Sequence, residues 1–466
     1  MKRVKNFKNK IAIKMMKVYN LENIQSVAIL KRLVKAIQPD ERSIIVVDTF
    51  PGIAKRLQNI SISLFHMDAE KTMEQLENLG NYCSDWLDNL LPFGALRTEA
   101  NKKLKEHIDQ ITCLCDEAPN LIDDHEIMAH GGMISSIILS YYLTECKKMN
   151  SVLDSCHFMR LGSDRKPDME YIKKDVEELM KDCPDVPILI TQSRLCKNVY
   201  NETDFFPQGG NEYYATVIGA VFHADEVVSA LHSNDICFYG IEETRTLTFG
   251  EAQNFVDSGI KLVPPPCLSL ARSTGMSIVL MKAPDMTEEQ LRISTEKTGQ
   301  EIKAVASRKG VVYIKLRSLG ILTSYLFIGK ISDIFEKYMV PVYLMTSSNV
   351  SISLAVECSK DTLRLMHREL RKYAEIGVEA EMSVISIIGN LEWEHAGLES
   401  KIIETFKEMP IYMISYGSSN HNVSILVREQ DREKALVSLA NVFLKIPLNT
   451  VDALSPYSSL QSSLII

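Results

Sequence analysis

The pattern that most constrains the fold is an internal repeat near the end of the chain. A strand pattern at residues 310–316 is followed by a helix pattern at 325–338, two further strand patterns and a helix pattern at 361–373. The same order of strand, helix, two strands and helix returns between residues 382 and 443. Each βαββα unit, about seventy residues long, is typical of a split ferredoxin-like module. Small open sheets of this kind bury their edges by pairing side by side, so we expect assembly and effector sites at strand edges.

The chain before this repeat, roughly its first 300 residues, has the pattern of one α/β domain. Apolar runs at residues 43–47, 187–191 and 277–281 have the length and composition of fully buried strands. Residues 67–105 and 121–143 carry helical patterns. We therefore predict a mostly parallel sheet with helices on both faces, followed by the two modules.

A corner from loop to helix lies in the middle of this domain. Pro207 ends the preceding segment, Gly209 and Gly210 supply a turn, and the apolar run at 216–222 predicts a buried helix. The beginning of a helix presents free N–H groups and a positive dipole end, which favour a phosphate or carboxylate ligand. Two glycines before a helix are more often only a turn, so both interpretations stay open here.

Composition and charge exclude several classes of protein. The chain has 466 residues, of which 45% are hydrophobic, and a net charge of −8, which argues against a nucleic-acid or anionic-membrane surface. The apolar runs are too short to span a bilayer. The ten cysteines form no CxxC pairs, so we read them as reduced thiols and predict no structural metal. We expect a cytoplasmic protein without nucleic-acid or membrane partners.

Several segments resemble the aspartokinases, which are amino acid kinases with tandem C-terminal ACT domains. The similarity is strongest at residues 316–319, 345–351, 387–390 and 415–422. It implies transfer of the γ-phosphate of ATP, with Mg²⁺, to the side-chain carboxylate of aspartate. This is the first step of lysine, threonine and methionine biosynthesis. It also implies feedback control by lysine, threonine or a related amino acid at the ACT domains.

The resemblance also implies a domain organisation. The implied parts are an N-terminal extension at 1–15, an amino acid kinase-like domain at 16–295, ACT domain 1 with its connecting segment at 296–382, ACT domain 2 at 383–450 and a C-terminal tail at 451–466.

The residues that would hold the nucleotide are only partly kept. Lys17 matches the lysine of the family's Lys-Phe-Gly-Gly-Thr-Ser, but the glycines and hydroxyls after it are missing. Lys261 matches the lysine of the family's Gly-Ala-Lys-Val. Gly209 and Gly210 are also kept, and the resemblance implies that all three residues bind the nucleotide. Asp48 begins the stretch that replaces Ser-Ala-Ser-Ala-Gly, and an acid there repels phosphate. The family's Thr-Asp-Val-Asp-Gly falls at 231–235, where its first aspartate and its glycine are lost.

The acceptor site is altered in the same way. The family's His-Gly-Glu is His130-Gly131-Gly132 here, so the acid that faces the substrate ammonium is missing. Gln208 replaces the arginine of Gly-Arg-Gly-Gly-Ser-Asp and cannot make its bidentate grip on a carboxylate. Ser135 is kept as a substrate-binding residue, and Glu212 would orient the acceptor. Removing one preorganised charged contact costs about 10²–10³ in rate, so we predict an impaired kinase.

The resemblance also places an effector site in the first module. The matching positions are Ile321, Ser324, Val342, Ser347 and Ser348. Tyr343 replaces an aspartate that meets the effector ammonium, and Leu326 replaces a glycine near the effector carboxylate. The serines could equally be cap and edge-strand groups without a ligand.

Two functions stay open at this point. In the first, the protein phosphorylates aspartate, with Lys17 and Lys261 on the phosphates and Glu212 as the orienting residue. In the second, it is a non-catalytic amino-acid sensor or regulatory partner that acts through its ACT domains. We expect a homodimer through these domains, or pairing with an active aspartokinase. A second aspartokinase with intact motifs in the same genome would favour the regulatory function.

Overall fold

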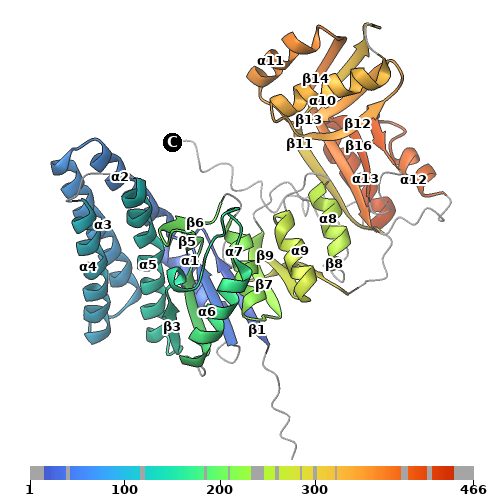
Figure 1. The fold of residues 1–466 in the computed structure, drawn as a ribbon. Coiled ribbons are helices and arrows are strands. Elements are labelled where there is room, and N and C mark those ends of the chain that lie inside the picture. Colours follow the sequence, from blue (N-terminus) through green and yellow to red (C-terminus); the bar gives the residue numbers. More distant parts are fainter. Residues whose placement is uncertain are drawn as a thin grey trace, which may run out of the picture. The chain divides into compact units, whose positions relative to one another are not determined.

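The structure is a computed structural model. It describes residues 15–37, 42–115, 121–182, 186–207, 210–231, 246–257, 262–283, 286–296, 302–320, 323–389, 397–416 and 422–444. The chain forms two compact units, which are drawn in Figure 1. The N-terminal unit comprises Met1–His232 and Pro264–Thr295, and the C-terminal unit comprises Ser233–Val263 and Glu296–Ile466. Among the described residues, none of the helices combines the length and the apolar character needed to cross a membrane.

The N-terminal unit is built on a mostly parallel sheet, as the sequence predicted. Its strands are β1 (Met16–Leu21), β2 (Arg42–Val47), β3 (Asn150–Leu153), β4 (Ile188–Gln192), β7 (Glu226–Leu231), β9 (Ser277–Lys282) and β10 (Glu289–Ser294). They lie in the order β3-β4-β2-β1-β7-β9-β10, and all neighbours are parallel except β9 and β10. Because the sheet is covered on both faces, the parallel strands are apolar along most of their length.

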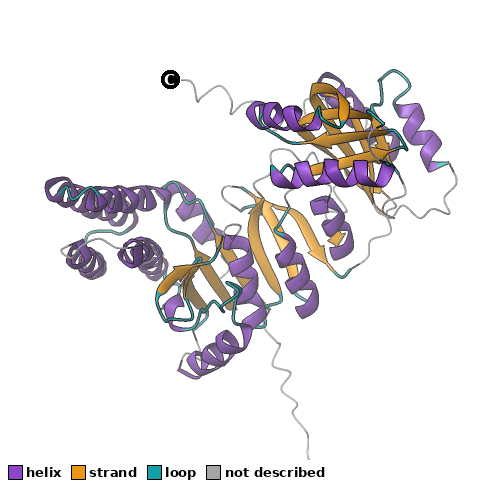
Figure 2. Cartoon of the chain, turned by 45° about the horizontal axis from the view of Figure 1, so that its top comes forward, coloured by secondary structure: helices purple, strands orange, loops and turns teal. Residues whose placement is uncertain are grey.

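Helices cover both faces of this sheet (Figure 2). One face packs on α1 (Val27–Ala36), α2 (Pro51–Phe65), α3 (Ala69–Leu90), α4 (Ala95–Cys115) and α5 (Leu121–Glu145), which share a single apolar core with the strands. The opposite face carries α6 (Met169–Asp182), α7 (Gly210–Val221) and α9 (Pro265–Thr274). The helical stretch predicted at 67–105 is two helices, because the chain turns between Leu91 and Gly94.

A short hairpin lies beside this sheet. It consists of β5 (Leu195–Lys197) and β6 (Thr203–Phe205), which pair antiparallel directly after β4 and before α7. The 3-10 helix η1 (Ser155–His157) precedes α6. The hairpin delivers the chain to the corner at Pro207, so it positions the beginning of α7.

The C-terminal unit contains the predicted repeat. Its elements are β11 (Ile302–Ser318), α10 (Ser324–Lys337), β12 (Val342–Ser347), β13 (Ser351–Val356), α11 (Lys360–Leu370), β14 (Ala374–Gly389), α12 (Leu398–Thr405), β15 (Met413–Ser415), β16 (Asn422–Arg428), η2 (Glu429–Asp431) and α13 (Arg432–Leu444). Two elements from earlier in the chain, β8 (Thr246–Thr248) and α8 (Phe249–Asp257), belong to this unit. Every predicted strand and helix of the repeat is therefore confirmed.

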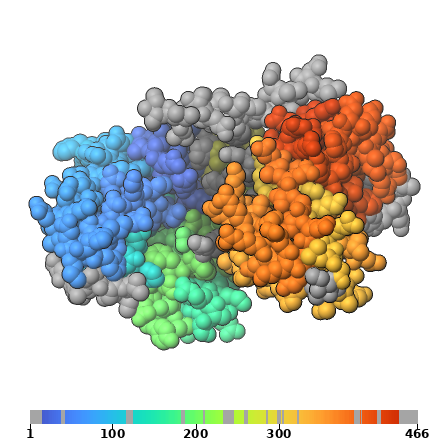
Figure 3. Space-filling view, turned by 90° about the horizontal axis from the view of Figure 1, so that it is seen from above, coloured from blue at the N-terminus to red at the C-terminus, as the bar shows by residue number. Residues whose placement is uncertain are grey.

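The two modules differ from the prediction in one respect, because they share a sheet. Within the described residues it has six strands in the order β12-β13-β11-β14-β16-β15. The long strands β11 and β14 pair from Ile302 with Gly389 to Ser318 with Ala374, and the register shifts between Arg308 and Tyr313. Each half of these strands belongs to a different module, with separate apolar cores under α10–α11 and under α12–α13. In the space-filling view, the orange surface of the first module passes directly into the red surface of the second (Figure 3).

Candidate functional site

The candidate site lies at the carboxyl edge of the parallel sheet, where open α/β sheets bind ligands. Glu22 follows β1, Asp48 follows β2, and Ser193 and Arg194 follow β4. Asn211 is the second residue of α7. We call these five residues the carboxyl-edge cluster. The strand ends are aligned, because Leu21 is in register with Val47 and Val47 with Gln192.

The amide of Asn211 holds this cluster together. Its Nδ2 donates to Asp48 Oδ2 at 3.0 Å and to Glu22 Oε2 at 3.2 Å. Its Oδ1 accepts from Ser193 Oγ at 3.2 Å. One side chain in the first turn of α7 is thereby bonded to groups that follow β1, β2 and β4. Side chains of the chain itself thus occupy the beginning of a helix, which is a favourable place for an anion.

Two acids dominate the charge of this edge. Burial raises the pKa of Asp48 above its ordinary value, and the negative charge of Glu22 acts in the same direction. The Thr49 N–H donates to Asp48 Oδ1 at 2.8 Å, and this bond, the Asn211 amide and the positive charge of Arg194 all lower that pKa without cancelling the effect of burial. Burial therefore outweighs the groups that stabilise the ionised Asp48 carboxylate.

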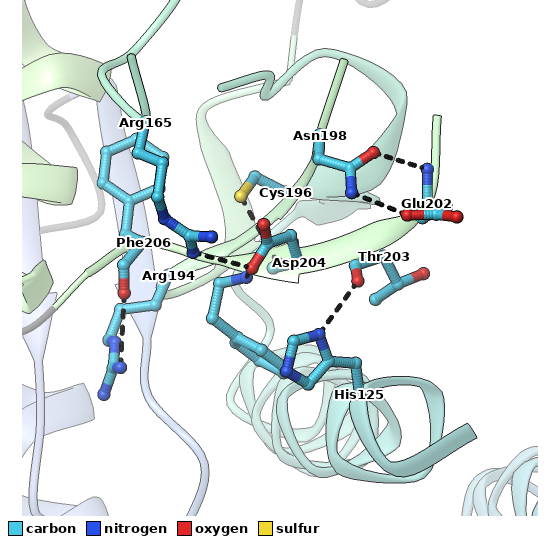
Figure 4. A network of polar contacts seen from close by, with 10 residues as sticks. His125, Arg165, Arg194, Cys196, Asn198, Glu202, Thr203, Asp204 and Phe206 are labelled. Carbon is cyan, nitrogen blue, oxygen red and sulfur yellow. Dashed lines mark hydrogen bonds and ion pairs between the residues drawn. The ribbon is translucent and has the colours of Figure 1, made fainter. Parts of the chain in front are cut away.

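Arg194 is the cation of the cluster. Its backbone has a φ of 64°, in the left-handed region that a non-glycine residue seldom adopts. Its Nη2 donates to the carbonyl of Phe206 at 3.3 Å (Figure 4), and its Nε is buried without a hydrogen-bond partner. A Cβ at Gly210 would lie 3.4 Å from this Nε and 3.3 Å from the Phe206 Cβ. Glycine therefore allows the first turn of α7 to approach the guanidinium.

The hairpin β5–β6 fixes the position of Phe206 and hence of Arg194. Figure 4 shows the Asp204 carboxylate, which accepts from Arg165 Nη2 at 3.2 Å. His125 Nδ1 of α5 lies 3.3 Å from the carbonyl oxygen of Thr203. These two contacts bind strand β6 of the hairpin to neighbouring parts of the N-terminal unit.

Helix α5 closes the cluster from the other face. A Cβ at Gly131 would lie 2.6 Å from the Thr49 Cγ2, and one at Gly132 would lie 3.2 Å from the Gln192 Cβ. The fully buried Ser135 donates from Oγ to the Gly131 carbonyl at 2.8 Å and accepts from the Phe50 N–H at 3.0 Å. The Ser135 hydroxyl is thus engaged at the beginning of α2, and its predicted contact with substrate stays a prediction.

Lys17 lies at the opposite end of β1 from the cluster. Its Nζ is 3.8 Å from Glu226 Oε2, and Lys17 and Glu226 are register partners near the first residues of β1 and β7. Glu226 also pairs with Arg292 of β10. Lys17 and Glu22 are five positions apart, and an extended strand spans roughly 16 Å over that length. The structure does not bring Lys17 to the cluster, and the residues at the end of β1 are Asn20 and Leu21.

The other nucleotide and substrate residues are placed only in part. Gly210 and Glu212 are in the first turn of α7, next to Asn211. Gln208, Gly209 and Lys261 lie outside the described residues, as does the stretch 232–235.

The predicted effector residues lie around α10 and β12. Ser324 Oγ donates to the Asn349 carbonyl at 3.1 Å. Ser348 Oγ accepts from the Ser351 N–H at 3.1 Å in the turn between β12 and β13. Val342 and Ser347 are exposed on β12, and Ile321 lies outside the described residues. The bonds of Ser324 and Ser348 are cap and turn contacts, while a contact with an effector stays a prediction.

Tyr343 joins a polar group at the far side of β12. Its hydroxyl accepts from Arg308 Nη1 at 2.6 Å and donates to Glu357 Oε2 at 2.7 Å. Burial and the bond to Glu357 raise the pKa of Tyr343 to about 12. The Tyr343 hydroxyl is therefore engaged within the chain.

His130 faces a second histidine instead of the cluster. Its Nδ1 is 2.9 Å from the Nδ1 of His107 on α4. Burial lowers the pKa of His130 to about 4, and the charge of His107 acts in the same direction. Both rings are therefore neutral near pH 7, with one acting as donor and the other as acceptor.

The motif comparison missed three polar residues near the site. They are Asn20, Thr191 and Arg194. The signal in the sequence was the presence of Asn20 and Thr191 in strands that are otherwise apolar. Arg194 could not be singled out, because its place beside α7 depends on the path of the hairpin.

The described residues of the carboxyl-edge cluster do not fit ATP and Mg²⁺ well. The cluster has two carboxylates and one guanidinium, and the carboxylates are bonded to Asn211. Over the described ranges, no three or more histidine, cysteine, aspartate or glutamate residues gather as a metal site. We derive no phosphoryl-transfer step from this geometry.

Comparisons with known proteins find an ACT domain and similarity to aspartokinases. The ACT domain family matches residues 385–443. Lysine-sensitive aspartokinase 3 of Escherichia coli (strain K12) is 23% identical over 424 residues, covering 86% of this chain and 92% of that protein. The chloroplastic aspartokinase 3 of Arabidopsis thaliana is 26% identical over 266 residues, covering 53% of this chain and 47% of the plant protein.

Solved structures show the same fold. The Clostridium acetobutylicum aspartate kinase has a TM-score of 0.75 at 16% identity, covering 93% of this chain and 100% of that chain. Escherichia coli aspartokinase III in complex with lysine and aspartate has a TM-score of 0.74 at 20% identity, covering 92% of this chain and 99% of that chain.

Proposed function

We propose that this chain, a homologue of the aspartokinases with an ACT domain in its C-terminal unit, is a regulatory amino-acid-binding protein whose phosphoryl transfer is strongly reduced or lost. The relatives are named as aspartokinases, so the ancestral reaction is phosphorylation of aspartate by ATP. One observation carries the proposal. The Asn211 amide at the beginning of α7 is bonded to two carboxylates of the chain, Asp48 and Glu22.

The carboxylates oppose phosphate through their charge. A negative charge about 4 Å from an ionised carboxylate is repelled by about 4 kcal/mol at an effective dielectric constant of 20. Phosphoryl transfer depends on positive groups around the phosphates and on positioning. Lys17 is bonded to Glu226 instead, so it does not supply such a charge at this edge.

The C-terminal unit exposes a strand edge that supports the pairing part of the proposal. The edge strand β12 exposes Val342 and Met345, and the neighbouring α10 exposes Tyr325, of which 88% is accessible, and Leu326. An edge strand with apolar neighbours is suited to pairing with another chain. We propose that this edge forms a homodimer or pairs with an active aspartokinase, and that an amino acid is the effector. One similar structure contains lysine, which supports an amino acid as the class of ligand.

The deciding experiment measures nucleotide binding and turnover in one preparation. ATP with Mg²⁺ is titrated into the full chain by calorimetry, and aspartate phosphorylation is trapped as the hydroxamate. An active aspartokinase is run in parallel as a positive control. We expect no binding at millimolar ATP. Turnover comparable to that of the control would overturn the proposal.

A double variant tests whether the two acids are the cause. Replacing Glu22→Gly and Asp48→Ser removes both carboxylates from the carboxyl-edge cluster. We expect weak ATP binding to become measurable in this variant, because the repulsion is gone. A Glu70→Ser variant in the first turn of α3 is a control that removes a single acid outside the cluster, and it should leave ATP binding unchanged.

Pairing through β12 is tested separately. Met345→Glu places a charge on the exposed edge, and we expect sedimentation to show dissociation of the oligomer. The control is Leu365→Glu on α11, a residue that is also exposed but lies away from the strand edge. Equal effects of the two substitutions would argue against β12 as the interface.

A further inference from the structure

A groove lies between helices α3 and α4, which run side by side at the outer edge of the N-terminal unit (Figure 1). Its volume is about 560 Å³, and its lining residues are Met73, Glu74, Leu76, Glu77, Gly80, Asn81, Ile108 and Thr112. The apolar Met73 side chain is 58% exposed at this groove. A solvent-open groove with apolar side chains between two helices is suited to docking of another protein segment.

One side of this groove is acidic. Glu70, Glu74 and Glu77 of α3 are exposed, and their i, i+4, i+7 spacing places them on one face of the helix. In the described part of the chain, these three carboxylates form no ion pair. Helix α3 as a whole has five acidic residues and one basic residue. A segment that fits the groove should therefore combine apolar side chains with several positive charges.

The N-terminal extension has this combination in its sequence. Residues 1–14, which lie outside the described residues, contain six basic residues and no acidic residue. Val4, Phe7 and Ile11 have the i, i+3, i+7 spacing of the side chains that anchor an amphipathic helix in a groove. The extension thus complements the groove both in charge and in apolar pattern.

The contacts of α4 show where the groove lies relative to the sheet. Ile108 lines the groove, and the residue before it, His107, contacts His130 of α5. The residue after His130 is Gly131, which packs against Thr49 just past the carboxyl end of β2. The groove at Ile108 is therefore level with the carboxyl edge of the sheet.

The extension is too short to reach this groove in its own chain. It joins β1 at Met16, the amino end of that strand, and β1 is roughly 17 Å long. Helix α5 lies between α4 and the sheet, which adds about 8–10 Å sideways. Ile11 is only four positions before Met15, and four residues of chain span at most about 14 Å. An extension that fills the groove must therefore come from another copy.

We propose that residues 4–11 of one copy dock in the α3–α4 groove of a second copy. Val4, Phe7 and Ile11 cover the apolar part of the groove beside Met73, and the lysines between them pair with the acidic side of α3. Reciprocal exchange of the two extensions closes the pair, because each contact is then made twice. This contact lies in the N-terminal unit and does not involve β12, so it goes beyond the proposed function.

Photo-crosslinking in the full chain locates the contact. A chain with Phe7→p-benzoylphenylalanine, in normal isotopes, is mixed with an isotopically heavy chain that lacks the probe, and the adducts are identified by mass spectrometry. We expect adducts between light and heavy chains at Met73 and its neighbours on α3 and α4. The control places the same probe at Tyr200, which is 80% exposed at the tip of the β5–β6 hairpin and should give no adduct on these helices.

A fluorescently labelled peptide of residues 1–14 measures the strength of binding. Its anisotropy, titrated with the full chain, should show saturable binding that weakens as salt screens the charges. A control peptide with Val4→Ser, Phe7→Ser and Ile11→Ser keeps all six basic residues. This control should bind at least tenfold more weakly, because the apolar anchors are missing.

Charge reversal tests the pairing with α3. The double variant Glu74→Lys, Glu77→Lys of the full chain should bind the peptide at least tenfold more weakly. A peptide with Lys5→Glu and Lys8→Glu should regain affinity for this variant while losing affinity for the unchanged chain. A merely structural role of the two acids would not produce this exchange of preference.

The matched control reverses two exposed acids on another helix. Glu170→Lys with Glu177→Lys on α6 makes the same change in net charge and should alter the affinity for the peptide less than about twofold. Met345→Glu, which is designed to break pairing through β12, should also leave peptide binding unchanged. Failure of this proposal is therefore distinguishable from failure of the proposed function.

Three results would overturn the proposal. The first is no peptide binding at millimolar concentration, and the second is equal binding of the serine-substituted peptide, which would mean attraction by charge alone. The third is the absence of adducts between light and heavy chains on α3 and α4.

Discussion

The two units of this protein differ in what their residues support. In the N-terminal unit the strands of the parallel sheet are present, and Asp48, Glu22 and Arg194 stand at their carboxyl ends, where we propose that phosphate binding is reduced. In the C-terminal unit every predicted strand and helix of the repeat is present, with β12 at the edge of the sheet. A fold and the chemistry of its site are separate properties, so the first does not imply the second.

The largest expected difference between the units is in catalysis. We predict aspartate phosphorylation at least about 10³-fold below that of an active aspartokinase, because several charged contacts are replaced together. The hydroxamate assay measures this directly. An activity within tenfold of the control would mean that the N-terminal unit is as well preserved as the C-terminal unit.

The next effect concerns the pH stability of the N-terminal unit. Because burial depresses the folded-state pKa of His130 to about 4, the unfolded chain binds a proton that the folded chain does not between pH 6.5 and 4. The stabilisation by the neutral ring is complete above about pH 6.5, and about 3 kcal/mol is lost as the pH falls to 4. Burial also lowers the pKa of His107, whose other charged neighbours are Glu106, Lys103 and Asp154, so His107 adds to the loss.

Urea unfolding at pH 7 and pH 4.5 checks this prediction. A His130→Gln variant keeps a hydrogen-bonding group opposite His107 and removes one titrating ring, so its free energy of unfolding should fall less between the two pH values. An equal fall in both proteins would contradict the assignment.

The close contact between Gly131 of α5 and Thr49 should also make the N-terminal unit more sensitive to an added methyl group than the C-terminal unit. Gly131→Ala places a methyl group 2.6 Å from Thr49, and we expect a loss of about 1–3 kcal/mol of stability. Gly329→Ala on α10 is the matched control, because no atom lies within 4 Å of its added Cβ. This control should gain up to about 1 kcal/mol from helix propensity. Thermal unfolding of both variants makes the comparison, and a stable Gly131→Ala protein would refute the close approach.

The smallest predicted effect tests whether Ser347 and Ser348 have a structural role or bind an effector. Ser348→Ala removes the hydroxyl that accepts from the Ser351 N–H, so we expect a loss of about 1 kcal/mol in unfolding free energy. Ser347→Ala, at the neighbouring exposed position, should change stability by less than about 0.5 kcal/mol. If Ser347→Ala nevertheless weakens binding of an amino acid, Ser347 is an effector residue, whereas an unchanged affinity removes it from that site.

The sequence by itself determined many of the elements this chain forms, but not the division of residues 67–105 into two helices or the β5–β6 hairpin. The strands at 43–47 and 187–191 and the whole βαββα repeat could be read from local patterns, because apolar periodicity is a property of neighbouring residues. The replacement of the family's glycine loop and acceptor arginine was also predicted from local motifs, and it stays a prediction. The assignment of Lys17 to phosphate could not be checked in this way, because it depends on which end of β1 carries the site.

Only the tertiary structure decided how distant residues meet. The two modules share one sheet because Ile302 pairs with Gly389 and Ser318 with Ala374, partners that no local pattern identifies. Asn211 bonds to Asp48 and Glu22 across more than 160 residues of chain. Such contacts depend on strand order and on the path of the loops, which follow from the packing of the whole unit and not from the preferences of any segment.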